Sequence, residues 1–214
     1  MKTNVEIALT THCNANCPTC ARTNLQTLKK YNWLELKHLS EEEYWRVVDC
    51  GIKFSNIKYC GEFGDPLMHP KLDQFIKDTV KKYPDVKIEI STNAGIRSNK
   101  WWTGLAKKYS KNVVIIFAID GIDQASNEKY RIGVDFNKAF SNMKTYIDNS
   151  GQGIWHFIVF TWNWHLISQA SKIAKNLGIE IHFKINRRKY GRVTLEEKEK
   201  ALILIKEAYN EQQN

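Results

Sequence analysis

Residues 10–22 read Thr-Thr-His-Cys-Asn-Ala-Asn-Cys-Pro-Thr-Cys-Ala-Arg, and this stretch carries three thiols with the spacing C-x3-C-x2-C. It follows a short apolar alternation at residues 5–9, which predicts a β-strand. The asparagines and the proline within it are typical of a tight loop. The sequence therefore predicts a loop at a strand end that directs the sulfurs of Cys13, Cys17 and Cys20 toward one point.

Three kinds of site are open to these thiols. A structural zinc ion normally has four protein ligands, and the two remaining cysteines, Cys50 and Cys60, do not form a second closely spaced pair. An iron–sulfur cluster normally takes four cysteines, so three would leave one iron free for chemistry. A disulfide is disfavoured because the chain has five cysteines, an odd number. The spacing favours a cluster, with zinc and unligated thiols as the alternatives.

The composition indicates one globular domain over residues 1–214, because 43% of the residues are hydrophobic and 26% are charged. No apolar run approaches the roughly 18–20 residues of a membrane span, and the N-terminus lacks the apolar core of a signal peptide. Free cysteines without such a signal predict the reducing cytoplasm. The net charge of +9 fits either a lysine-rich surface or an anionic partner, nucleic acid included.

Strand and helix patterns alternate along the rest of the chain. Strands are predicted over residues 5–9, 52–59, 86–90, 113–119, 154–160 and 179–185. Helices are predicted over residues 41–50, 71–82, 99–109, 137–148, 166–177 and 194–209. Capping boxes that begin at Ser40 and Thr194 support the first and last helices. Residues 21–39 show no clear pattern, although Arg22 lies close enough to influence a cluster if it is not simply exposed.

Six strand–helix units with short connections predict an α/β fold with parallel strands and right-handed crossovers. A (β/α)6 partial barrel and an open doubly wound sheet both satisfy this pattern. No G-x-G-x-x-G motif follows the first strand, which disfavours a dinucleotide-binding fold. In either architecture the site lies at the carboxyl ends of the strands.

The cysteine spacing is identified as the signature of the radical S-adenosylmethionine (SAM) superfamily. Cys13, Cys17 and Cys20 match its motif residue for residue, and the resemblance covers residues 5–185. It implies a (β/α)6 partial TIM barrel that holds a [4Fe-4S] cluster on these cysteines and SAM on the open iron. The family usually has an aromatic residue before the third cysteine, where this chain has Thr19.

Later motifs resemble the SAM-binding regions of the same family. Phe63-Gly64-Asp65-Pro66 is similar to its Gly-Gly-Glu-Pro motif, with an aspartate in place of the glutamate. The resemblance implies a set of SAM-binding residues: Thr19, Gly64, Asp65, Ser91, Thr92, Asn93, Asp120, Arg131, Phe160 and Asn163. Taken alone, Asp65 also suits a helix cap, Asp120 a turn and Arg131 an exposed surface.

Residues 117–121 and the pair Tyr130-Arg131 are similar to the peptide-maturase branch, which often carries an added SPASM domain. Ala118 stands where that branch has a SAM-binding serine. Because no cysteine follows Cys60, the expectation is a short member without the SPASM domain, similar to poorly characterised viral and bacterial proteins.

The resemblance implies an enzyme that cleaves SAM reductively to methionine and a 5′-deoxyadenosyl radical, which takes hydrogen from an unidentified small molecule or peptide. The electron donor would be a protein such as flavodoxin or ferredoxin. SAM cleavage without a separate substrate, and a non-catalytic iron–sulfur or zinc module, are the alternatives. No catalytic acid or base is assigned.

The six residues from Arg187 to Arg192 include four cations. This pattern predicts either a solvated loop or a loop that holds an anionic substrate through bidentate hydrogen bonds. The candidate substrate residues are Glu62, Trp162, His165, Arg187, Arg188 and Arg192.

Overall fold

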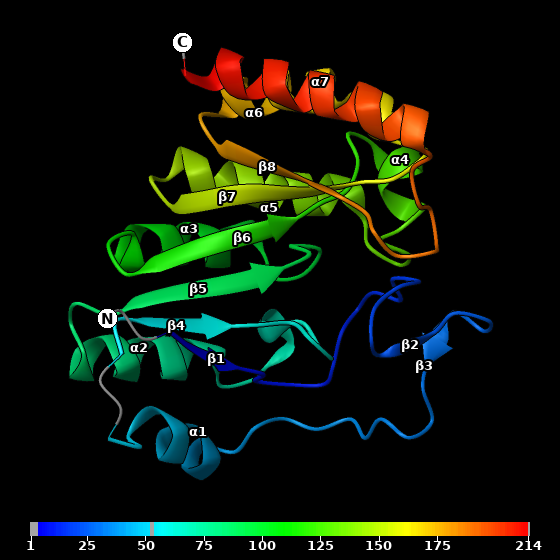
Figure 1. Cartoon of the computed structure of the whole chain (residues 1–214). Coiled ribbons are helices and arrows are strands. Elements are labelled where there is room, and N and C mark those ends of the chain that lie inside the picture. The colour runs from blue at the N-terminus through cyan, green and yellow to red at the C-terminus, as the bar shows by residue number, and fades with distance from the viewer. Residues whose placement is uncertain (1–3, 52–53, 214) are drawn as a thin grey trace.

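The computed structural model describes residues 4–51 and 54–213, which form a curved sheet backed by helices (Figure 1). The sheet has six parallel strands in the order β1-β4-β5-β6-β7-β8. Their bounds are β1 (Asn4–Ile7), β4 (Asn56–Tyr59), β5 (Lys87–Thr92), β6 (Val113–Ala118), β7 (Gln152–Val159) and β8 (Glu180–Ile185). Spatial order equals chain order, as in a barrel that has not closed.

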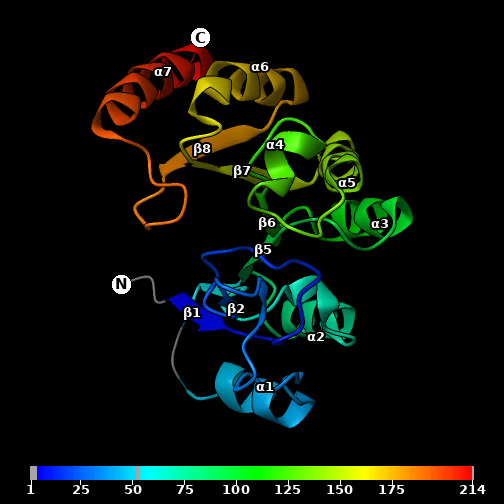
Figure 2. The same cartoon turned by 90° about the vertical axis from the view of Figure 1, so that its right-hand side faces the viewer.

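The helices alternate with these strands. Their bounds are α1 (Glu41–Val48), α2 (Leu72–Lys82), α3 (Asn99–Tyr109), α4 (Gln124–Glu128), α5 (Phe136–Asp148), α6 (Ile167–Leu177) and α7 (Leu195–Gln213). Two short 3-10 helices, η1 (Pro66–Met68) and η2 (Trp164–Leu166), follow strand ends. Figure 2 shows α2, α3 and α5 along one side of the sheet. No helix in residues 4–51 and 54–213 combines the length and apolar content that crossing a bilayer requires.

One face of the sheet forms the core, and the other mixes polar side chains with apolar ones such as Ile116 and Ile158. The helix-facing positions are fully buried and apolar, and they include Ile57, Tyr59, Ile88, Ile90, Ile115, Phe117, Trp155, Phe157 and Ile181. On the concave face, Lys58 of β4 lies between Glu6 of β1 and Glu89 of β5, at 3.4 and 3.6 Å. Period-two alternation therefore leaves the inside of the partial barrel open to polar groups.

The predicted elements agree with the structure in type but not in every boundary. The capping box at Ser40 is present, with Glu43 N 3.1 Å from Ser40 Oγ. The first strand ends at Ile7 rather than at residue 9, and the last helix continues to Gln213. The predicted strand over residues 52–59 is observed over Asn56–Tyr59, while residues 52 and 53 lie outside the described residues.

Several short elements have no counterpart among the predicted ones, the hairpin and α4 among them. A small hairpin of β2 (Thr23–Asn24) and β3 (Lys29–Lys30) follows the cysteine loop, and α4 precedes α5. Both are too short to produce a recognisable hydrophobic period, which needs a window of about 11–18 residues for a helix.

Candidate functional site

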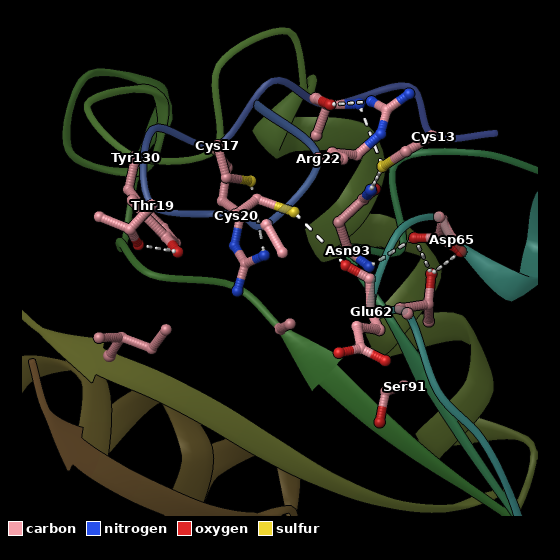
Figure 3. A pocket seen from close by; sticks show the side chains of 18 of the residues that line it. Cys13, Cys17, Thr19, Cys20, Arg22, Glu62, Asp65, Ser91, Asn93 and Tyr130 are labelled. Carbon is pink, nitrogen blue, oxygen red and sulfur yellow. Dashed lines mark hydrogen bonds between the residues drawn. The ribbon is translucent and has the colours of Figure 1, made fainter. Parts of the chain in front are cut away.

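A cavity of about 430 Å³ lies at the carboxyl ends of the strands, and we call it the strand-end cavity. Figure 3 shows the three cysteines on one side and Glu62 and Ser91 across from them. The predicted site residues that line it are Cys13, Cys17, Thr19, Cys20, Glu62, Gly64, Asp65, Ser91, Thr92, Asn93, Arg131, Phe160 and Arg188. Segments separated in the sequence by more than a hundred residues thus share one cavity because parallel strands end at the same edge.

Gly64 allows the loop after β4 to pack against the cysteine loop. A Cβ on this residue would lie 2.2 Å from the carbonyl oxygen of Thr10 and 2.7 Å from that of His12. The next residue, Asp65, donates its backbone N–H to the His12 carbonyl at 2.8 Å. Only glycine permits this approach of two backbones.

The carboxylate of Asp65 lines the strand-end cavity and is held by hydrogen bonds from the chain itself. It is 3% exposed. Its oxygens accept hydrogen bonds from Leu67 N at 3.0 Å, Thr92 Oγ1 at 2.9 Å and Asn93 N at 2.9 Å. Burial raises the pKa of Asp65, and these donors act against that effect. The carboxylate caps η1 and ties the end of β5 to the loop after β4.

Asp120 and Arg131 form a buried ion pair beside the cysteines. Arg131 Nε lies 2.6 Å from Asp120 Oδ2, and Arg131 Nη1 donates to Cys17 Sγ at 3.7 Å. The other carboxylate oxygen accepts the backbone N–H of Ile158 at 2.6 Å. Burial opposes the charge of Arg131, but Asp120 and Cys17 outweigh it and raise the pKa of the guanidinium. Asp120 is therefore more than a turn residue, and Arg131 is not an exposed surface residue.

Asn163 is fully buried and does not line the strand-end cavity. Its side chain donates to the carbonyls of Asp120 and Ile158 and accepts the N–H of Phe160 at 2.6 Å. Phe160 does line the cavity, and its ring stacks on Trp162 with centroids 4.6 Å apart. Asn163 therefore positions the end of β7 and the Phe160 ring.

The sulfurs receive hydrogen bonds from groups around them. Cys13 Sγ accepts from Ala15 N at 3.4 Å and from Asn93 Nδ2 at 3.9 Å. Burial raises the pKa of Cys13 to about 12 and also raises that of Cys17. In the metal-free chain these groups are thiols, so metal binding would release their protons.

Within the described ranges, no three His, Cys, Asp or Glu side chains lie close enough together to hold a single metal ion. A zinc ion would need its ligands within about 2.0–2.3 Å of one point. A four-iron cluster instead distributes its cysteines over different irons. The three cysteines are therefore not arranged around a single metal position within the described ranges.

Arg22 supplies the clearest sign that the strand-end cavity accepts an anion. It is 5% exposed and lines the cavity. Its terminal nitrogens donate to the carbonyls of Ala15 at 3.0 Å and Thr11 at 3.4 Å. Among the described residues, its Nε has no hydrogen-bond partner and no carboxylate pairs with the guanidinium. A buried unpaired cation is unfavourable unless an anion neutralises it, and a thiolate-ligated cluster is such an anion.

The candidate substrate residues do not converge on one place. Glu62 and Arg188 lie at the strand-end cavity, where Arg188 Nη1 donates to the carbonyl of Thr19. Trp162 lies behind Phe160, and His165 is exposed on η2. Arg187 and Arg192 line a second hollow between β8 and α7.

The strand-end cavity also contains residues that the sequence patterns did not identify as site residues, among them Ala15, Ile158 and Asn186. Asn186 follows β8 directly, so the strand-end rule that identified Ser91 and Asp120 would have found it. Ala15 and Ile158 carry no polar signal and were accessible only from the fold.

Comparison with protein-family models gives no match. No curated protein matches the sequence either. Solved structures do match. The chain aligns with anSMEcpe with bound AdoMet at 15% identity and a TM-score of 0.73, covering 99% of this chain and 60% of that one. Streptococcus suis SuiB bound to S-adenosylmethionine aligns at 14% identity and TM-score 0.74, with coverage of 99% and 48%.

SuiB bound to its precursor peptide SuiA aligns at 14% identity and TM-score 0.77, covering all of this chain and 47% of that one. The chain therefore spans between about half and three fifths of the length of these proteins. At such identities the likeness concerns the fold, and it confirms the α/β partial barrel that the radical SAM resemblance implied.

Proposed function

We propose that this chain is a radical SAM enzyme whose Cys13, Cys17 and Cys20 hold a [4Fe-4S] cluster in the strand-end cavity. When bound, the cluster and SAM supply one-electron cleavage of SAM to methionine and a 5′-deoxyadenosyl radical that takes hydrogen from a substrate. The observation that carries this proposal is the buried, unpaired Arg22 beside three cysteines at one cavity. The fold supports it, because structures that share it contain AdoMet.

The residues around the sulfurs would stabilise the thiolate ligands. Arg131 donates to Cys17, while Ala15 N and Asn93 Nδ2 donate to Cys13. Hydrogen bonds to ligating sulfurs and nearby positive charge both tune a cluster's reduction potential. Asp120 holds Arg131 in place, so its contribution is to position that donor.

SAM would occupy the part of the strand-end cavity opposite the cysteines. Glu62 and Ser91 offer polar groups there, while Ile158 and Phe160 offer apolar surface for the adenine ring. Ala118 lines the same wall without a hydroxyl. Four predicted residues would act indirectly, because they maintain the backbone geometry around the cavity: Gly64, Asp65, Thr92 and Asn163.

The substrate would be a small molecule or a peptide, and a protein such as flavodoxin or ferredoxin would deliver the electron in the reducing cytoplasm. A peptide substrate gains support from SuiB, which was solved with its precursor peptide. The charges near the strand-end cavity and along β8 favour an anionic substrate.

The test is anaerobic reconstitution with iron and sulfide, followed by SAM and dithionite. We expect about four irons per chain and release of 5′-deoxyadenosine detected by mass spectrometry. Cys17→Ala should release none. A fully loaded cluster that binds no SAM would overturn the enzyme proposal and favour a non-catalytic iron–sulfur module. A cleavage rate that no added substrate changes would favour SAM cleavage without a separate substrate.

A further inference from the structure

A hollow of about 1020 Å³ lies between β8 and α7, and we call it the β8–α7 groove. The cations that line it are Lys184, Arg187, Arg192 and Lys198, and its lining includes no aspartate or glutamate. Within residues 4–51 and 54–213, none of these four cations is paired with a carboxylate. Grouped cations without counter-charges raise the local concentration of anionic ligands.

The wall formed by α7 is apolar and open to solvent. Leu195 is 81% exposed and Leu202 is 48% exposed, and both line the groove together with Tyr209. Contiguous exposed apolar side chains bounded by charges mark a binding surface. A small inorganic anion would leave this wall uncovered, so the matching ligand carries apolar groups as well as negative charge.

The opposite wall is an unpaired strand edge. Among the described residues, β8 is the last strand of the sheet and its strand partner is β7, as Figure 1 shows. Asn186 N donates toward β7, to the carbonyl of Val159, and the alternating positions therefore direct their backbone groups outward. Phe183 N is covered by Tyr209 Oη at 3.3 Å, while Ile185 presents its backbone to the groove. An edge of this kind accepts a further extended chain.

The groove meets the strand-end cavity at Asn186, which lines both. The Asn186 side chain donates to the carbonyls of Arg188 and Tyr190, at 3.1 and 2.6 Å, and accepts the N–H of Arg188 at 3.0 Å. The loop between the two hollows is therefore held by several hydrogen bonds. A chain that lies along the groove ends next to the cavity where the chemistry is proposed.

We infer that the β8–α7 groove binds an extended, acidic peptide segment with apolar side chains, which pairs with the edge of β8 and belongs to the substrate. This inference deepens the proposed function by naming a substrate class. A nucleic acid fits less well, because single strands bind through stacking on aromatic rings. The exposed apolar side chains here are chiefly the leucines of α7.

The experiment measures fluorescence anisotropy with the full-length chain and a labelled peptide of about ten residues, the length of a long strand. The peptide alternates glutamate with valine. Three further probes are the same peptide with lysine for glutamate, the same acidic peptide N-methylated at alternate residues, and single-stranded oligothymidine. We expect saturable binding of the acidic peptide only, because N-methylation removes the donors that edge pairing needs.

The variant Arg187→Gln/Arg192→Gln should weaken acidic-peptide binding roughly fivefold, since it removes two exposed cationic partners of the glutamates. The control Lys81→Gln/Lys138→Gln changes the net charge equally on α2 and α5, away from the groove, and should bind as the unaltered chain does. Cluster content is measured on every variant, so that a loss of peptide binding is compared only between chains that are equally folded and loaded.

Absence of acidic-peptide binding, equal loss in the two double variants, or equal binding of the N-methylated peptide would each overturn the inference. Tighter binding of oligothymidine that the Arg187 and Arg192 changes abolish would assign the groove to nucleic acid instead. Because binding to the groove requires neither iron nor SAM, failure here with intact SAM cleavage overturns only this inference. Failure of SAM cleavage with intact peptide binding overturns only the proposed enzyme.

Discussion

Arg131 donates a hydrogen bond to Cys17 at 3.7 Å, although the two residues are 114 positions apart in the chain. The same guanidinium is paired with the fully buried carboxylate of Asp120. One cation therefore joins the end of β6 to the cysteine loop. Removing Arg131 should therefore affect stability, through the buried carboxylate of Asp120, and cluster binding, through the predicted ligand Cys17.

Arg131→Met should lower the free energy of unfolding of the metal-free chain by about 3–5 kcal/mol, since it leaves Asp120 buried without its partner. Urea denaturation measures this difference. Arg131→Met/Asp120→Asn should recover part of the loss. Lys144→Met, which breaks an exposed pair with Asp148, should cost less than about 1 kcal/mol. Equal effects of the Arg131 and Lys144 changes would contradict the structural role of the buried pair.

Each of Cys13→Ala, Cys17→Ala and Cys20→Ala should prevent formation of a stable cluster, because two thiolates retain four irons poorly. Iron and sulfide analysis with the visible absorption spectrum checks this after anaerobic reconstitution. Cys50→Ala and Cys60→Ala are the matched controls and should load normally. Full iron content in any of the first three variants would remove the ligand assignment.

Arg22→Met tests whether this guanidinium interacts with the cluster. In the metal-free chain it removes the hydrogen bonds to the carbonyls of Ala15 and Thr11, so the free energy of unfolding should fall by about 1–3 kcal/mol. In the loaded chain it should lower the reduction potential, since positive charge favours the more negative reduced cluster. A redox titration followed by electron paramagnetic resonance measures the potential. The exposed Arg187→Met is the control, and an unchanged potential for Arg22→Met would show that Arg22 does not interact with the cluster.

Gly64→Ala should destabilise the chain by roughly 1–3 kcal/mol or more, because the added Cβ meets two backbone carbonyls that are unable to move independently. Its cluster loading should fall as the cysteine loop is displaced. Gly104→Ala on α3 adds a Cβ with no atom within 4 Å and should be neutral or stabilise by about 0.5–1 kcal/mol. Thermal melts and iron analysis compare the two variants. Equal melting temperatures and equal iron content would contradict the close backbone contact at Gly64.

Burial lowers the pKa of His156 from an ordinary 6.5 to about 4, with smaller contributions from the cations Lys184, Lys58 and Arg131 and from His182. The unfolded chain therefore binds more protons between these two values, so the free energy of unfolding falls as the pH drops from 6.5 to 4. Above 6.5 this residue contributes no pH dependence.

His156 changes the free energy of unfolding by at most about 3 kcal/mol across this pH range. Partial exposure of the ring reduces this contribution. In His156→Gln, urea denaturation of the metal-free chain should show a shallower decline of stability across this range. An identical pH dependence in both proteins would show that the ring is not kept neutral by the fold.

Much of the fold and part of the site could be predicted because their signals are local. A short continuous apolar run marks β6, and a serine followed three residues later by glutamate marks the start of α1. Once the strands are parallel, residues that follow them, such as Ser91 and Glu62, must share one edge. The hairpin of β2 and β3 has two residues per strand and gave no such signal.

The sequence by itself determined that this protein alternates strands and helices and that its three clustered cysteines lie in a loop at a strand end. Only the tertiary structure decided which charges serve the site. Asp65 is saturated by hydrogen bonds from the chain, Arg22 is buried without a carboxylate, and Arg187 faces a separate groove. The physical reason is that periodicity and capping depend on neighbouring residues, whereas desolvation and hydrogen-bond satisfaction depend on which distant segments pack together.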